Sequence, residues 1–87
     1  MKYDINYIKK VHQFSSNHKI ELLESNLCGC FYCCRTFNPN KIIEWIEDEN
    51  GTKGTAICPL CDIDSVLSDK YPINDKYFLK EMCEYWF

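Results

Sequence analysis

Two Cys-x-x-Cys pairs carry most of the chemistry that this 87-residue chain can support. Cys30 and Cys33 form the first pair, Cys58 and Cys61 form the second, and residues 34–57 separate them. Two thiols with two residues between them can hold one metal ion from a single tight turn, and two such turns supply the four sulfurs of a tetrahedral zinc site. The spacing therefore predicts one structural Zn²⁺ bound by these four cysteines.

Three further cysteines, Cys28, Cys34 and Cys83, do not follow this spacing. We expect them to be small buried side chains, because free cysteine is among the most buried residue types. Cys28 and Cys34 flank the first pair, so either could replace Cys30 or Cys33 as a ligand, and the sequence leaves that choice open. A second metal on the three, with a histidine, is the weaker alternative.

The cysteine count and the start of the chain favour reduced thiols. Seven is an odd number, and residues 1–4 carry an acid and lead into an amphipathic stretch without the apolar region of a secretory signal. We therefore expect a cytoplasmic protein. Thioredoxin-type redox chemistry would need only one of the two pairs and a βαβ context, whereas a metal site uses both pairs, so we do not expect an enzyme of that kind.

Size, composition and charge narrow the class of protein. A single domain of this length, 46% hydrophobic and 15% aromatic, is too apolar for a disordered chain, but it gains little stability from its core alone and needs a staple. No stretch approaches the roughly 20 apolar residues of a membrane span. The formal charge is −3, and residues 58–87 hold most of the acidic excess, which opposes binding to a nucleic-acid backbone.

Periodic apolar residues predict a helical hairpin over residues 1–27. The first helix begins after Asp4, which can cap it, and closes near Phe14. The second runs from His18 to about Ser25. Its expected apolar face consists of Ile20, Leu23 and Leu27.

Residues 28–69 are expected to form the metal-binding core. A short strand at residues 35–37 leaves the first pair, and Asn38-Pro39 then suits the cap and first position of a helix that ends near Asp48. Its apolar face would contain Ile42, Ile43, Trp45 and Ile46. A turn at residues 49–51 and a strand over 52–57 would deliver the second pair.

A helix is also expected at the second pair, because Pro59 suits its first turn and Asp62, Asp64 and Ser65 can cap it. A first pair on a hairpin and a second pair at a helix start describe a treble-clef finger better than a zinc ribbon, in which both pairs lie on hairpins. Residues 70–87 complete the domain with a helix that begins at Asn74 or Asp75. The predicted fold is thus a small α+β treble-clef-like zinc-binding domain with an N-terminal helical hairpin and a C-terminal helix.

Several short stretches together resemble a group of small bacterial proteins described mostly as cytoplasmic or hypothetical. They are Ser16-Asn17-His18, Cys30-Phe31-Tyr32-Cys33, Phe37-x-Pro39, Ile42-x-x-Trp45, Thr55-Ala56-x-Cys58-Pro59-x-Cys61-x-Ile63-Asp64-Ser65-Val66 and Trp86-Phe87. The resemblance implies a treble-clef-like zinc domain and brings no established activity. In that group a glycine is expected where this chain has Asp62.

The function predicted from these features is a non-catalytic, zinc-stabilised module that binds another protein. Aromatic residues anchor protein interfaces, and the C-terminal third offers several that could be exposed. They are Tyr71, Tyr77, Tyr85 and Phe87. The sequence names neither the partner nor the oligomeric state.

Two alternatives belong to other classes. A nucleic-acid-binding finger would use Lys9, Lys10, Lys19 and Arg35. A degenerate relative of HNH nucleases would need a histidine base near the second pair, but residues 34–87 contain no histidine. His12 and His18 precede the first pair, and local hydrogen bonding suits them better. Asp64 and Ser65 could also border a surface groove with Ser16-Asn17-His18, and the sequence does not decide their roles.

Overall fold

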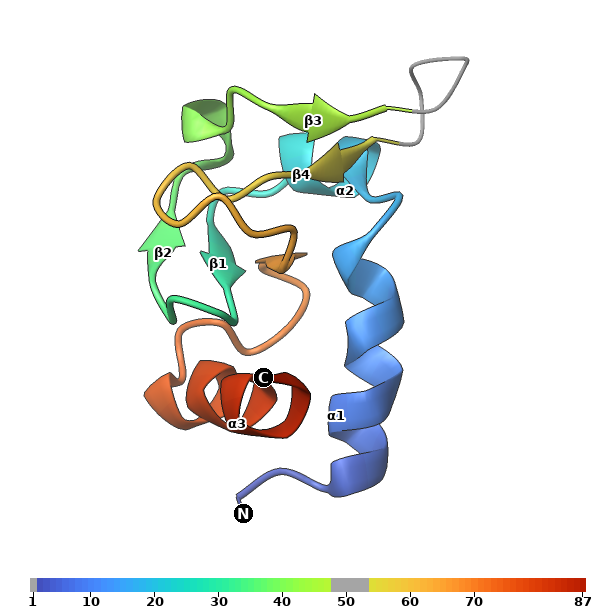
Figure 1. Ribbon diagram of the computed structural model, residues 1–87, viewed down its shortest axis with the longest axis vertical. Coiled ribbons are helices and arrows are strands. Elements are labelled where there is room, and N and C mark those ends of the chain that lie inside the picture. Colours follow the sequence, from blue (N-terminus) through green and yellow to red (C-terminus); the bar gives the residue numbers. More distant parts are fainter. Residues whose placement is uncertain (1, 48–53) are drawn as a thin grey trace.

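The computed structural model describes residues 2–47 and 54–87, and in them helices combine with two small antiparallel sheets (Figure 1). The helical elements are α1 (Ile5–His12), η1 (Gln13–Ser15), α2 (Lys19–Leu23), η2 (Pro39–Lys41) and α3 (Lys76–Trp86), where η marks a 3₁₀ turn. The strands are β1 (Cys28–Cys30), β2 (Thr36–Phe37), β3 (Trp45–Ile46), β4 (Thr55–Ala56) and β5 (Val66–Ser68). The α+β class is confirmed, and none of these helices is long and apolar enough to cross a bilayer.

The larger sheet has the strand order β2-β1-β5, with β1 in the middle and all neighbours antiparallel. Cys28 on β1 faces Phe37 on one side and Ser68 on the other, and Cys30 faces Val66. In the smaller sheet β3 pairs with β4, and Trp45 lies opposite Ala56. Because β1 ends at Cys30, the sheet places the first cysteine pair at the end of its central strand.

Two groups of buried side chains form the core, and α3 lies across the end of the molecule opposite the β3–β4 sheet (Figure 1). The helix-side cluster joins α1, α3 and the residues around them: Ile8, Val11, Phe31, Leu67, Ile73, Phe78, Leu79 and Met82. The metal-side cluster contains three cysteines among its members: Leu22, Cys28, Cys30, Phe37, Ile42, Ala56, Cys58 and Val66. One half of the core is thus an ordinary apolar cluster, and the other is built around thiols.

The starts of α1 and α3 agree with the cap predicted at Asp4 and with the helix start predicted at Asn74 or Asp75. The carboxylate of Asp4 accepts a hydrogen bond from the backbone N–H of Asn6 at 2.7 Å, and that of Asp75 accepts from the N–H of Tyr77 at 2.9 Å. Phe14 lies in η1, which continues the first helix by one 3₁₀ turn. A capping side chain works within its own turn, so local sequence was enough to locate both helix starts.

The predicted helical hairpin is wrong, because the two N-terminal helices pack against different partners. α1 packs against α3, whereas α2 packs against β5 and η2. Leu22 is the buried residue of α2, while Ile20 and Leu23, expected on its buried face, are 61% and 58% exposed. The carbonyl oxygen of Gly54, directly before β4, accepts hydrogen bonds from the backbone N–H groups of His18 and Lys19 at the start of α2. This attachment to the strand determines which face of the short helix is buried.

The helix predicted to end near Asp48 is also wrong. Asn38 caps and Pro39 begins a single 3₁₀ turn, but Ile42 is already extended, with φ −74° and ψ 120°. Trp45 then belongs to strand β3. The isoleucines of this segment are compatible with helical and with strand spacing, so their pattern does not distinguish the two. Pairing with β4 stabilises the strand. The predicted turn at 49–51 and the first residues of the 52–57 strand lie outside the described residues, and β4 confirms that strand at Thr55–Ala56.

Candidate metal centre

The first cysteine pair lies in a tight turn that we call the first knuckle, residues 30–35. The backbone N–H of Cys34 donates to the carbonyl oxygen of Cys30 at 2.8 Å, and the N–H of Cys30 donates to the carbonyl oxygen of Arg35 at 3.0 Å. The N–H of Tyr32 points at the Cys30 sulfur, 3.3 Å away. These bonds close the turn around its own cysteine and join β1 to β2.

The second pair repeats this geometry in the second knuckle, residues 58–63. The N–H of Asp62 donates to the carbonyl oxygen of Cys58, and the N–H of Cys58 donates to that of Ile63, both at 2.9 Å. The N–H of Leu60 points at the Cys58 sulfur, 3.4 Å away. Residues far apart in the sequence thus build two equivalent turns.

Both knuckles require a left-handed backbone at the residue after the second cysteine. The φ angle is 58° at Cys34 and 64° at Asp62. Glycine adopts this conformation without steric cost, and aspartate tolerates it better than most side chains do. The conformation explains why glycine is expected at the position of Asp62, and the turn forms here with aspartate in its place.

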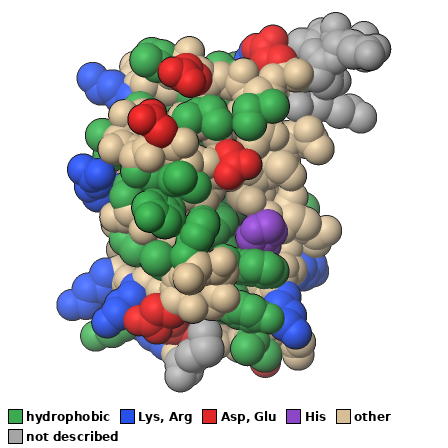
Figure 2. Space-filling model, viewed as in Figure 1, with side chains coloured by type: hydrophobic (Ala, Val, Ile, Leu, Met, Phe, Trp, Pro, Cys, Tyr) green, Lys and Arg blue, Asp and Glu red, His purple; other side chains and the backbone are tan. Residues whose placement is uncertain are grey.

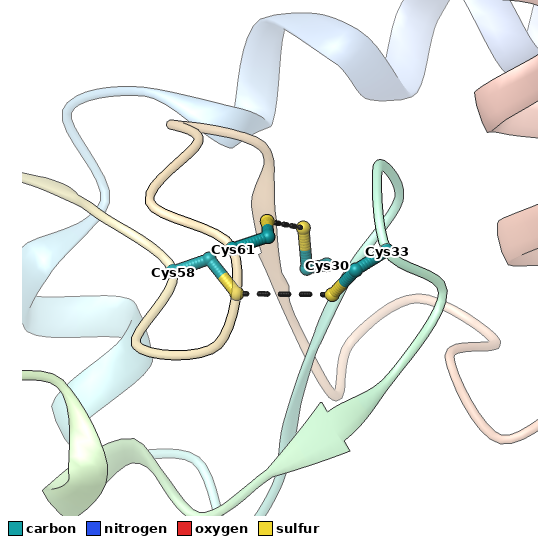
Figure 3. A group of neighbouring side chains, drawn as sticks. All are labelled: Cys30, Cys33, Cys58 and Cys61. Carbon is teal, nitrogen blue, oxygen red and sulfur yellow. Dashed lines mark hydrogen bonds between the residues drawn. The ribbon is translucent and has the colours of Figure 1, made fainter.

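The two knuckles point their sulfurs toward one another (Figure 3). The four sulfur atoms of Cys30, Cys33, Cys58 and Cys61 lie within 4.8 Å of one another. The Cys30–Cys61 and Cys33–Cys58 sulfur pairs are 3.6 and 3.9 Å apart. A zinc–sulfur bond of about 2.3 Å gives a tetrahedron with edges of about 3.8 Å, whereas a disulfide would need about 2.0 Å. The predicted cysteines therefore form a cluster consistent with one metal ion.

The three remaining cysteines lie outside this cluster. Cys28 is buried, donates to the carbonyl oxygen of Phe37 at 3.3 Å, and has a pKa raised to about 12, chiefly by burial. Cys34 is exposed and Cys83 is half-buried, so the expectation that all three are buried holds only for Cys28. Neither flanking cysteine replaces a member of the first pair in the four-sulfur group.

Burial and hydrogen bonds act in opposite directions on the clustered thiols. Burial raises the pKa values of Cys58 and Cys61. Burial would also raise the pKa of Cys33, but hydrogen bonds from the backbone and side chain of Arg35, together with neighbouring thiols, lower it overall. A divalent cation would favour the thiolate form of all four, because thiolates are the form that binds metal.

Ser65 lies at the cysteine cluster, whereas its place in the sequence suited a cap of the expected helix or the border of a surface groove. Its side chain is 2% exposed, and its hydroxyl oxygen lies 3.0 Å from the Cys30 sulfur. Either group could donate when Cys30 is a thiol, but a thiolate can only accept, so the hydroxyl would donate to a metal-bound Cys30. No sequence pattern indicated this contact, because it forms only when the strand after Ser65, β5 (Val66–Ser68), pairs with β1 and its Cys30.

The helix expected at the second pair is absent. Residues 59–61 form a turn, Asp62 is left-handed, and the chain then enters β5. The treble-clef arrangement is therefore not confirmed, because its defining helix is missing from residues 54–75. Each knuckle instead lies on a loop that leads into a strand of the three-stranded sheet. Asp64, expected in the first turn of that helix, is exposed.

His18 is held by the backbone on both sides. It is 5% exposed, its Nδ1 donates to the carbonyl oxygen of Phe14 at 2.9 Å, and its Nε2 accepts the N–H of Ala56 at 3.1 Å. Burial lowers its pKa, and the hydrogen bond that Nε2 accepts from Ala56 requires the neutral ring. With both nitrogens engaged, His18 has no free atom for use as a general base. His12 packs its ring on Trp86, with centroids 4.0 Å apart.

The basic residues considered for nucleic-acid binding lie on separate elements. Lys9 and Lys10 belong to α1, and Arg35 follows the first cysteine pair. Lys19, at the start of α2, forms an ion pair with Glu47. They come from three parts of the fold and not from one helix or strand.

No known protein family, no curated protein and no solved structure matches this chain. The fold and the site define a small α+β protein with a four-cysteine cluster that could hold one metal ion. The resemblance to small bacterial proteins gains no family assignment from these comparisons and stays a prediction.

Proposed function

We propose that the four cysteines bind one Zn²⁺ and that this ion has a structural role. The observation that carries the proposal is the four-sulfur group itself, whose contacts match the edges of a zinc–thiolate tetrahedron. Four protein sulfurs leave no coordination position for a substrate or a water molecule, which is typical of structural sites. Bound zinc would supply the cross-link between the two knuckles.

The location of the ligands supports a structural role. Cys30 and Cys58 are fully buried members of the metal-side cluster, together with Leu22, Ala56 and Val66. Without a metal, this half of the core would bring together four thiols in place of packed hydrocarbon. Since metal binding to such sites is coupled to folding, the ion would stabilise the strands that carry the knuckles.

We further propose that the folded module binds another protein through a surface at the knuckle tips. This knuckle face consists of Tyr32, Ile43, Leu60 and Phe87, which are 45%, 83%, 46% and 61% exposed. Tyr32 and Phe87 contact each other edge to face, with ring centroids 4.8 Å apart. Figure 2 shows hydrophobic side chains gathered over the middle of one face of the molecule.

Rigid support makes the knuckle face suitable for recognition. Tyr32 and Leu60 occupy equivalent positions in the two knuckles, so the metal would fix both side chains. Aromatic and aliphatic residues held in place lose little conformational entropy on binding. Among the aromatics predicted for an interface, Phe87 and Tyr77 are exposed, whereas Tyr71 and Tyr85 pack against the helix-side cluster.

Elemental analysis of reduced, freshly purified protein tests the metal, with one zinc per chain expected. Capture of partners from a bacterial lysate, followed by mass spectrometry, tests the surface. We expect the double variant Tyr32→Ser with Leu60→Ser to lose a partner that the wild-type chain retains. A matched control is Ile20→Ser with Leu23→Ser, which removes two apolar side chains from α2 that are somewhat more exposed than Tyr32 and Leu60. Identical capture by both double variants would contradict the proposed surface.

A further inference from the structure

An open groove of about 430 Å³ lies between the first knuckle and the start of α3. Arg35 and Thr36 line one side, and Asn74 and Lys76 line the other. Leu79, which is buried, contributes to the apolar part of the lining. The groove therefore combines an aliphatic surface with two cationic side chains.

The two cations of the groove have no carboxylate partner among the described residues. Lys2, Lys19, Lys70 and Lys80 each form an ion pair with a described carboxylate, whereas Arg35 and Lys76, like Lys9, Lys10 and Lys41, form none. Lys76 only places its ammonium over the ring of Tyr77, 5.4 Å from the centroid. None of the described residues that line the groove is acidic. In a chain with a formal charge of −3, this is a local positive site.

Arg35 is oriented by the metal centre. One guanidinium nitrogen donates to the carbonyl oxygen of Leu60, in the second knuckle, at 3.4 Å. A guanidinium group has five N–H donors, so donors remain for a ligand. Its planar fork matches the two oxygens of a carboxylate.

We infer that the groove binds an acidic peptide segment of the partner protein, with a carboxylate on Arg35 and Lys76 and an aliphatic neighbour on Leu60 and Leu79. The inference rests on the proposed protein-binding function and adds the chemistry of the partner. The positive charges in the groove complement a carboxylate. A small inorganic anion has no apolar group to contact the aliphatic lining, whereas a peptide side chain does. A long polyanion is disfavoured because the rest of the chain is acidic.

The position of Arg35 links peptide binding to metal binding. Arg35 belongs to the first knuckle and donates to the carbonyl oxygen of Leu60 in the second, so a metal ion that joins the two knuckles would also keep the guanidinium in place. A ligand that binds the metal-loaded form better than the metal-free form must raise metal affinity by the same factor. We expect the acidic peptide to slow zinc loss to a chelator.

Fluorescence anisotropy with the full zinc-loaded chain and a labelled hexapeptide, Gly-Leu-Asp-Asp-Leu-Gly, tests the inference. The same peptide with Asn in place of both Asp is expected to bind at least tenfold more weakly. Arg35→Gln and Lys76→Gln are each expected to weaken binding about fivefold or more. Lys80→Gln removes the same charge from the same helix outside the groove and is expected to change binding less than twofold.

Zinc content and thermal melts of the variants show whether Arg35→Gln damages the metal centre, and Lys76→Gln keeps the test independent of the cysteines. Absence of binding by the acidic peptide, equal binding of the Asn peptide, or tighter binding of inorganic phosphate would each overturn the inference. If the knuckle-face variant still loses its partner while the peptide does not bind, the groove assignment fails and the protein-binding function stands. If the knuckle-face variant keeps its partner, the proposed function fails instead.

Discussion

Replacing Ser65 by alanine should weaken metal binding without removing a ligand. The Ser65 hydroxyl lies 3.0 Å from the Cys30 sulfur, and the side chain is 2% exposed. Water cannot replace the lost donor at such a buried position. The Cys30 thiolate would keep its contact with the N–H of Tyr32 but lose its hydroxyl partner. The variant thus isolates one hydrogen bond to the cluster.

Two independent rules give the same size for this effect. A hydrogen bond to a charged group contributes about 1.5–3 kcal/mol, and loss of a group that supports a metal ligand weakens metal affinity by about 10–100-fold. Since about 1.4 kcal/mol corresponds to a factor of ten, these ranges overlap. We therefore expect the zinc affinity of Ser65→Ala to fall 10–100-fold.

Competition with a chromogenic zinc chelator at pH 7 measures this affinity. Ser68→Ala is the matched control, because Ser68 is a fully buried serine of β5 whose hydroxyl accepts the N–H of Lys70 and contacts no cluster sulfur in the structure. Cobalt substitution adds a spectroscopic test, since sulfur-to-cobalt charge-transfer bands should shift in Ser65→Ala and not in Ser68→Ala. Equal zinc affinities of the two variants would refute a hydrogen bond from Ser65 to the metal ligand.

Three further predictions concern the metal, His18 and the second knuckle. Chelation should abolish the cooperative thermal melt followed by circular dichroism, since structural zinc contributes roughly 10–16 kcal/mol of binding free energy to the folding of small domains. Elemental analysis should find no stoichiometric zinc in Cys58→Ala and one zinc per chain in Cys83→Ala. The pKa of His18 is lowered in the folded chain, whereas a histidine in the unfolded chain has a pKa near 6.5, so below that pH the unfolded chain binds a proton that the folded chain does not. The free energy of unfolding is therefore highest above about pH 6.5. It decreases by up to about 1.4 kcal/mol per pH unit as the pH falls from there to the folded pKa. Urea unfolding at pH 7.5 and 5.5 measures this loss, and His18→Gln should show a smaller one; identical pH dependence would exclude the histidine as its source. Asp62→Val should cost about 1–2 kcal/mol in urea unfolding because φ is 64°, whereas Asp62→Gly should cost nothing; equal losses would contradict the strained turn.

The cluster of cysteines could be predicted from the sequence because each knuckle is a local structure. Every backbone bond of the second knuckle joins residues between Cys58 and Ile63, and the first knuckle is equally short. Spacing alone therefore determines that each pair can hold a metal from one turn. Ser65 could not be recognised, since its contact with Cys30 exists only because β5 pairs with β1.

The same distinction explains the incorrect helices. Ile42, Trp45 and their neighbours carry apolar residues at helical spacing, but the chain there becomes β3 because β4 is available as a partner. Pro59 suits a helix start, yet the chain after Cys61 returns to the central strand as β5. Hydrogen bonds to neighbouring strands satisfy the backbone groups of β3 and β5. A local sequence pattern cannot predict these bonds, because the partner strands are distant in the sequence.

The amino-acid sequence by itself determined the cap at Asp4, the start of α3 near Asp75 and the two cysteine turns, because each depends on residues within a few positions of one another. It also determined the acidic balance of the chain, which is a sum over residue types. The tertiary structure decided the buried face of α2, the strands β3 and β5 and the donor on Cys30. Each of these depends on a partner distant in sequence, so its free energy appears only when the sheets have formed.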